Sequence, residues 1–162
     1  MAKIAIVMGS DSDWRVMENS YLTCKDFGVE AQVEVLSAHR TPEKMLEFAA
    51  GAQASGISVI IAGAGGAAHL PGMIASSTSL PVIGVPVSLG KLDGMDSLLS
   101  IVQMPAGVPV ATVSIDGGKN AALLALKILA TSDSALMQKL DEYRNELKEI
   151  VATKNQSLKD TL

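Results

Sequence analysis

The sequence has few residues of several kinds, and each shortage excludes a class of protein. Cys24 is the only cysteine, which excludes an intramolecular disulfide bond and leaves no cysteine cluster for zinc. Aromatic residues make up only 3% of a chain that is 48% hydrophobic, so most of the apolar side chains are aliphatic. Aliphatic side chains are typical of buried parallel strands and of the helices that cover them. The composition therefore favours an α/β protein.

Charge and hydropathy exclude two further classes. The formal net charge is −4 and the sequence has no basic cluster, so we expect neither nucleic acids nor anionic membrane surfaces as partners. No apolar run reaches the ~18 residues that suggest a membrane span. The sequence begins as a strand and lacks the long apolar region and small-residue cleavage site of a signal peptide. We therefore expect a cytoplasmic protein.

Short apolar runs alternate with helical patterns along the 162 residues, a length that suits one domain. Strands are expected at residues 4–8, 32–36, 57–62, 82–87 and 108–115. Helices are expected from Asp13 towards Gly28, from Pro42 to Gly56, after Pro71, and at residues 96–104 and 120–131. Strict alternation implies a parallel sheet with right-handed crossovers. We predict an α/β fold, a three-layer flavodoxin-like sandwich with a five-stranded parallel sheet and an extra C-terminal helix.

The extra helix is expected at residues 132–152, within a single catalytic domain that spans residues 1–162. Apolar residues recur in it at spacings of four and three: Leu136, Leu140, Tyr143, Leu147 and Ile150. This stripe fits a helix that packs on its own domain and fits equally a helix that docks on a neighbouring subunit. Together with the high hydrophobic content, it leads us to expect a homo-oligomer.

Polar residues and glycines gather where the expected strands end. Ligands of parallel α/β sheets bind outside the carboxyl ends of the strands. Those ends carry residues 9–13, 37–40, 63–69 and the segment from Ser88 onward, whereas the opposite ends carry few such residues. The sequence therefore predicts a ligand site at the carboxyl edge of the sheet.

The turn after the third strand matches the Gly-x-Gly-x-x-Ala pattern of dinucleotide-binding turns. That turn normally follows the first strand, and an acidic residue stands about 20 residues later. Here Ser88 and Leu89 stand in that region, so we disfavour a nicotinamide cofactor. Gly65 and Gly66 would let a ligand approach the backbone, whose N–H groups favour an anion. A tight strand-to-helix turn would need the same glycines.

Two other turns carry candidate binding residues. Ser10 and Asp13 could cap a helix, and Asp13 could also accept hydrogen bonds from sugar hydroxyls. Arg40 presents a planar fork of donors that suits phosphate. Its neighbour His39 can give and take protons near neutral pH, so we favour a functional His39 over a structural one. His69 could contact a ligand or only complete its turn, and two histidines without a suitably spaced carboxylate make a poor metal site.

Five stretches of this sequence resemble the N5-carboxyaminoimidazole ribonucleotide mutases of bacterial purine synthesis: residues 9–14, 37–42, 62–73, 94–105 and 120–125. Related carboxylases that use free carbon dioxide have lysine where Arg40 stands and lack the run from Ala67 to Pro71, so the resemblance is to the mutase class. The alternatives are such a carboxylase and a non-enzymatic flavodoxin-like binding module. A receiver domain is excluded because it needs an aspartate at the end of the third strand, which here ends in Ala62-Gly63.

The resemblance implies an isomerase that converts N5-carboxyaminoimidazole ribonucleotide into 4-carboxy-5-aminoimidazole ribonucleotide, on the route to IMP. It implies a homo-octamer that uses no metal and no organic cofactor. It implies that His39 is the catalytic acid and base. The implied substrate-binding residues are Ser10, Asp13 and Arg40 for the ribonucleotide, Ser37 at its phosphate, and Gly65, Gly66 and His69 around the migrating carboxylate. The segment from Ile115 to Asn120 is shorter than the family leads us to expect, which affects local loop contacts.

Overall fold

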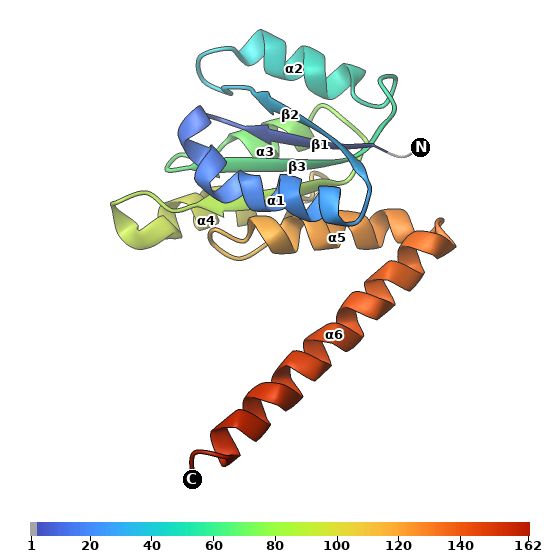
Figure 1. Ribbon diagram of the computed structural model, residues 1–162. Helices are drawn as coiled ribbons and strands as arrows, with labels where there is room; N and C mark the ends of the chain where they lie inside the picture. The colour runs from blue at the N-terminus through green and yellow to red at the C-terminus, as the bar shows by residue number, and fades with distance from the viewer. Residues whose placement is uncertain (1–2) are drawn as a thin grey trace.

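A computed structural model describes residues 3–162 (Figure 1). Its strands are β1 (Lys3–Met8), β2 (Glu30–Val35), β3 (Ile57–Gly65), β4 (Val82–Val87) and β5 (Ala111–Thr112). Its α-helices are α1 (Trp14–Asp26), α2 (Pro42–Gly51), α3 (Leu70–Ala75), α4 (Met95–Val102), α5 (Gly118–Ala130) and α6 (Ser134–Lys159). Two short 3₁₀ turns are η1 (Asp11–Asp13) and η2 (Leu92–Gly94).

The strands form one five-stranded sheet in the order β2-β1-β3-β4-β5, and every neighbouring pair is parallel. Alternate residues of a strand point to opposite faces of the sheet. Accordingly, Ile4 and Ile6 of β1 pack in the core beneath α1 and α5, whereas Ala5 and Val7 pack in the core beneath α2, α3 and α4. Helices therefore cover both faces, and the predicted three-layer flavodoxin-like sandwich is confirmed (Figure 1).

The first two strands begin one and two residues before their predicted starts, and β2 ends at Val35 rather than residue 36. The third and fifth strands differ more from the prediction. The fifth strand was expected at residues 108–115 but has only two residues, Ala111–Thr112. Pro109 lies inside the expected range, and proline has no N–H with which to pair with a neighbouring strand. The third strand is longer than expected and continues to Gly65, which pairs with Val87. Gly63 in this strand has no side chain, and the Met17 side chain fills the space that a Cβ would occupy.

The last helix, α6, also differs from the prediction, since it extends to Lys159 rather than residue 152. Its inner turns pack on the body: Leu136 and Leu140 are buried, and the Tyr143 ring lies edge-on to Phe27, with centroids 5.8 Å apart. Leu147 and Ile150 of the same stripe are 44% and 49% exposed. Figure 1 shows that the outer part of α6 projects away from the sandwich. The inner part of the stripe is therefore buried against the domain, and its outer part is exposed.

Within residues 3–162, no helix has both the length and the apolar character that crossing a membrane requires.

Candidate active site

A pocket of about 300 Å³ lies at the carboxyl edge of the sheet. Its walls are formed by the end of β3, by the loops that follow β1, β2 and β3, by the first residue of α3 and by one side chain beyond β4. The lining residues are Gly9, Ser10, Ser12, Asp13, Ser37, Ala38, His39, Arg40, Ala64, Gly65, Ala67, His69, Leu70 and Leu89. The structure thus brings together every predicted site residue except Gly66.

A larger hollow, of about 900 Å³, lies at the opposite edge, beside Lys25, Glu30 and Asp133. No histidine lines this hollow in the part of the chain that the structure describes. Ligands of parallel α/β sheets bind at the carboxyl ends of the strands, and proton transfer near neutral pH is best done by histidine. The smaller pocket is therefore the candidate active site.

The turn after β1 gives the pocket a fixed carboxylate. The Ser10 N–H donates to Asp13 Oδ2 over 3.2 Å, and the Ser12 N–H donates to Ser10 Oγ over 3.3 Å. These reciprocal bonds cap η1, which confirms the predicted capping role of Ser10 and Asp13. Both residues also line the pocket. Asp13 is only 5% exposed, and this burial raises the pKa of its carboxyl group, while the Ser10 N–H and the charge of Arg15 lower that pKa to a smaller extent.

The two histidines of the chain meet in the pocket. Nε2 of His39 lies 2.8 Å from Nδ1 of His69, so one of these nitrogens donates a hydrogen bond to the other. The ring planes are nearly perpendicular, at 87°, with centroids 4.9 Å apart. His39 comes from the loop after β2 and His69 from the turn before α3, so two separate connections supply the pair. The sequence predicted that both would be at this edge but did not predict their contact.

The loop that carries His39 is held by its own backbone. Ser37 Oγ accepts the Arg40 N–H over 3.2 Å, and the Ser37 carbonyl accepts the N–H and the hydroxyl of Thr41 over 2.9 and 3.1 Å. Within residues 3–162, no carboxylate lies within ion-pair distance of the Arg40 guanidinium. Since that guanidinium is exposed beside the pocket, its fork of donors is available to an anionic ligand.

Gly66 does not line the pocket, and its backbone N–H is already used. With φ at +67° it has a left-handed conformation that favours glycine. Its N–H donates over 2.8 Å to Oγ of the buried Ser97, whose hydroxyl donates over 2.8 Å to the Val87 carbonyl. Gly65 does line the pocket, and a Cβ added there would stand 3.0 Å from Cγ of Leu89. Gly66 thus shapes the turn, while Gly65 permits close packing.

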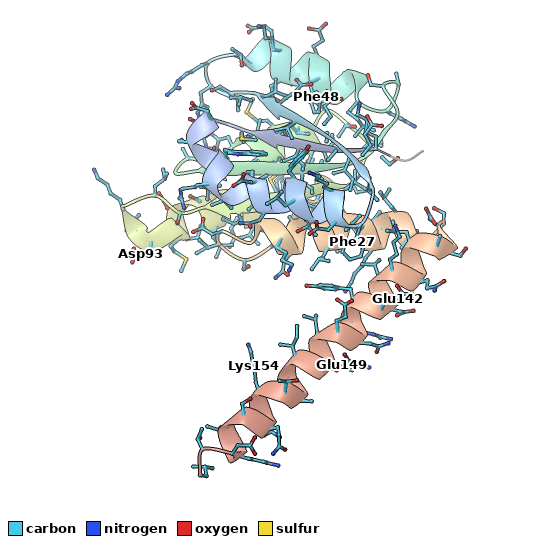
Figure 2. All side chains as sticks on the ribbon, in the orientation of Figure 1. Phe27, Phe48, Asp93, Glu142, Glu149 and Lys154 are labelled. Atoms are coloured by element: carbon cyan, nitrogen blue, oxygen red, sulfur yellow. The ribbon has the colours of Figure 1, made fainter. Side chains whose placement is uncertain are left out.

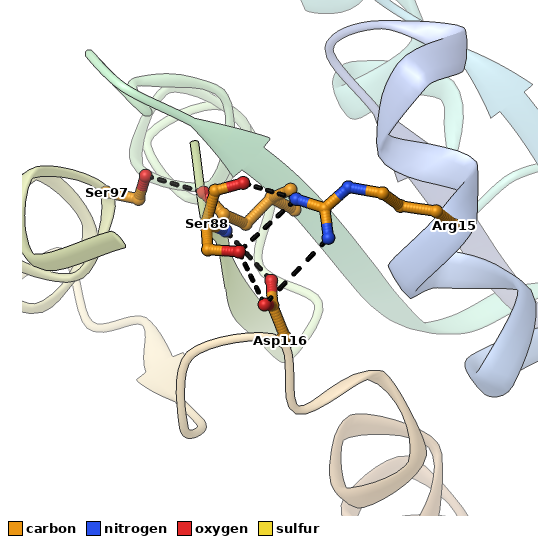
Figure 3. Close-up of polar contacts among 5 residues, drawn as sticks. Arg15, Ser88, Ser97 and Asp116 are labelled. Atoms are coloured by element: carbon orange, nitrogen blue, oxygen red, sulfur yellow. Dashed lines mark hydrogen bonds and ion pairs between the residues drawn. The ribbon is translucent and has the colours of Figure 1, made fainter. Parts of the chain in front are cut away.

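Sequence reasoning missed a polar network beside the pocket. Arg15 donates to the Ser88 carbonyl and lies 4.0 Å from a carboxylate oxygen of Asp116, which also binds Ser88 (Figure 3). Sequence analysis placed the segment from Ser88 onward at this edge, but for Asp116 the only signal was the shortness of the segment from Ile115 to Asn120. Leu89 and Ser12 also line the pocket; the segments that carry them were predicted at this edge, but neither residue was named among the site residues.

Comparison with known proteins shows the family of this chain and agrees with its fold. Residues 3–150 match the family model described as AIR carboxylase. The chain is 56% identical over 156 residues to N5-carboxyaminoimidazole ribonucleotide mutase of Mycobacterium tuberculosis strain H37Rv, covering 96% of this chain and 90% of that protein. It is 57% identical over 148 residues to the protein of the same name from Pyrococcus abyssi, covering 91% and 85%. A crystal structure of Treponema denticola PurE superposes with a TM-score of 0.89 at 27% identity, covering 98% and 99% of the two chains. This chain belongs to the AIR carboxylase family.

Proposed function

We propose that this protein is an N5-carboxyaminoimidazole ribonucleotide mutase of purine biosynthesis. It acts in the cytoplasm and needs no metal or organic cofactor. The observation that carries the proposal is a single pocket that combines a proton-transfer group, His39, with an anion-binding group, Arg40, and a buried carboxylate, Asp13. The names of the relatives that are 56% and 57% identical support the same reaction.

The ribonucleotide binds with its phosphate towards Arg40 and Ser37. The guanidinium supplies two parallel donors, which phosphate oxygens accept with good geometry. Asp13 accepts hydrogen bonds from sugar hydroxyls, and its cap through the Ser10 N–H keeps the carboxylate in place. These contacts place the imidazole ring beside His39.

The reaction moves a carboxyl group from a nitrogen outside the ring to C4 of the ring. The C–N bond of the carbamate breaks, its electron pair stays on nitrogen, and imidazolium His39 donates a proton to that nitrogen. The products of this step are an aminoimidazole and carbon dioxide. C4 then attacks carbon dioxide, and neutral His39 removes the C4 proton, which restores the aromatic ring and the imidazolium. One residue therefore acts first as acid and then as base.

Carbon dioxide must stay in the pocket between these two steps. Gly65, Leu89 and His69 form the wall where the loops after β3 and β4 meet. Leu89 packs against Gly65 and closes this wall of the pocket, and the proximity of carbon dioxide to C4 favours recapture over escape.

An isotope experiment tests the proposal. The substrate is prepared with a ¹³C-labelled carboxyl group, and conversion is followed in a large excess of unlabelled carbon dioxide. A mutase is expected to keep much of the label in the product. Complete loss of label would indicate a carboxylase that uses free carbon dioxide, and no conversion at all would reject the function.

Arg40→Lys is expected to raise the dissociation constant of the substrate about tenfold, although the positive charge is kept. Lysine is a point charge and loses the two-pronged geometry that phosphate can use. Isothermal titration with a non-reactive ribonucleotide analogue measures the effect. Lys44→Arg, an exposed change in α2 outside the pocket, is the matched control and should leave affinity unchanged. Unchanged affinity in Arg40→Lys would show that Arg40 does not bind the phosphate.

We also propose that the protein is a homo-octamer in which the outer part of α6 packs on a neighbouring subunit. The support is the apolar side chains that remain exposed there: Leu147, Ile150, Val151 and Leu158. Charged residues such as Glu149 and Lys154 lie on the same projecting part of the helix, as Figure 2 shows. Alternation of exposed apolar and charged side chains is typical of a helix that is partly covered in an assembly.

Light scattering at micromolar concentration is expected to give the mass of an octamer. Ile150→Glu places a charge in the exposed apolar stripe and should shift the mass to smaller species, because an unpaired charge is not tolerated in an apolar contact. The adjacent change Glu149→Gln should leave the mass unaltered. A wild-type protein that scatters as a stable monomer contradicts the proposal.

A further inference from the structure

The connection from β4 to α4, which includes η2, starts at a polar network outside the pocket. Asp116 accepts two hydrogen bonds from Ser88, from its N–H over 2.8 Å and from its hydroxyl over 2.6 Å. Arg15 of α1 donates to the carbonyl and the hydroxyl of Ser88 and lies 4.0 Å from the Asp116 carboxylate. Figure 3 shows Arg15 and Asp116 coming from different elements and converging on Ser88. Ser88 is therefore fixed to two other parts of the fold.

The residue that follows Ser88 forms part of the pocket wall. Leu89 packs so closely on the glycine turn that Cβ atoms added to Gly65 and Gly66 would lie 3.0 and 3.3 Å from its side chain. Leu89 is 45% exposed, so the body of the protein covers only part of it. Its position depends on where the chain is held on either side.

The middle of this connection makes few contacts with the body of the protein that could fix the position of Leu89. A Cβ added to Gly90 would meet nothing within 4 Å, and Leu92 is 71% exposed. Figure 2 shows Asp93 at the outer tip of the connection, pointing away from the body. At the far end, Gly94 packs against Ile115, whose Cγ2 lies 2.7 Å from the position of an added Cβ. The connection is therefore attached at its ends, and both attachments involve the segment that contains Ile115 and Asp116.

We infer that Asp116 and Arg15 are positioning residues that hold Leu89 against Gly65 and thereby keep carbon dioxide in the pocket during the reaction. Neither residue lines the pocket, so neither touches the reacting atoms. Asp116 and Arg15 both make charge-assisted hydrogen bonds to Ser88, whereas the exposed ion pair between them at 4.0 Å contributes little. Asp116 is the residue tested first, because it binds both the N–H and the hydroxyl of Ser88. The inference about carbon dioxide rests on the proposed mutase function.

Asp116→Gly tests this assignment. Asp116 has φ of +56°, a conformation that glycine adopts without strain, so the change removes the carboxylate and keeps the backbone. Asp93→Gly is the matched control, because Asp93 also has a positive φ, of +50°, and lies in the connection itself but outside the network. Asp116→Asn keeps an oxygen for the Ser88 N–H and tolerates positive φ, so it should restore part of the wild-type behaviour.

The first measurement is the escape of labelled carbon dioxide during turnover of ¹³C-carboxyl substrate. Asp116→Gly is expected to raise the ratio of escape to recapture about fivefold to tenfold, with Asp116→Asn between it and the wild type and Asp93→Gly unchanged. A purely structural role would change the melting temperature but not this ratio. Equal retention in Asp116→Gly and the wild type, or equal loss in Asp93→Gly, would overturn the inference.

The second measurement separates this inference from the proposed function. Amide hydrogen exchange of Leu89 and Gly90 should accelerate about tenfold in Asp116→Gly but not in Asp93→Gly, whatever the enzyme's substrate is. Unchanged exchange in Asp116→Gly overturns the positioning role. A wild-type protein that does not convert the ribonucleotide rejects the function, while the exchange result still decides whether Asp116 holds the connection. If Asp116→Gly does not fold, Asp116→Asn must show both effects at smaller size, and an Asp116→Asn enzyme identical to the wild type overturns the inference.

Discussion

His39→Asn should lower kcat by about 10²-fold or more and leave substrate affinity close to that of the wild type. Asparagine keeps part of the size and hydrogen bonding of histidine but cannot carry a proton between nitrogen and C4. Arg40, Asp13 and Ser37, which bind the ribonucleotide in the proposed complex, are unchanged. The variant therefore separates binding from proton transfer.

Turnover assays and isothermal titration of the same preparations measure the two quantities. His69→Asn is the informative comparison, because it removes the ring that lies 2.8 Å from His39 but keeps His39 itself. We expect a smaller fall in kcat for this variant, about tenfold. A His39→Asn enzyme that retains most of its turnover would remove His39 from the mechanism and make it a structural residue.

Gly118→Ala should decrease the free energy of unfolding by about 1–3 kcal/mol. Gly118 is the first residue of α5, and a Cβ added there would stand 2.4 Å from the carbonyl oxygen of Val16 in α1. The obstacle is backbone, so it cannot rotate away as a side chain would. Ser20 of α1 also donates to the Gly118 carbonyl over 2.7 Å, and separating the helices would stretch this buried bond.

Urea unfolding at matched protein concentration measures the change, since stability depends on concentration if subunits associate. Gly51→Ala is the control: Gly51 is the last residue of α2, and nothing lies within 4 Å of an added Cβ. Removing a helical glycine should there stabilise the protein by up to about 1 kcal/mol. A Gly118→Ala protein as stable as the wild type would show that α1 and α5 can separate at little cost.

The sheet could be predicted from the sequence because its signals are local. Apolar runs such as Ile4–Met8 are marked by hydrophobic periodicity and bounded by turn residues, and parallel strands place all their carboxyl ends at one edge. The same argument brought His39, Arg40 and Asp13 to one pocket. The fifth strand was predicted too long because its apolar residues were weighed above Pro109.

The remaining features depend on contacts between residues far apart in the chain. Arg15 and Ser88 are 73 residues apart, and Ser88 and Asp116 are 28 apart. The Gly66 N–H donates a hydrogen bond to Ser97, which is 31 residues away in the sequence. Sequence analysis had expected this N–H to face a ligand. Such pairs cannot be predicted from the periodicity of a single segment, because they form only when several helices and strands pack together.

The cap at the start of η1 has a consequence for genetics. Ser10 and Asp13 both close the turn and line the pocket, so a substitution at either position is expected to change folding and catalysis together. A growth screen would report a folding defect and a catalytic defect at these positions as the same phenotype. It would not show which of the two a substitution causes. Only the dependence of thermal stability on added ribonucleotide distinguishes them, because a variant that folds but has lost its contacts gains no protection from the ligand.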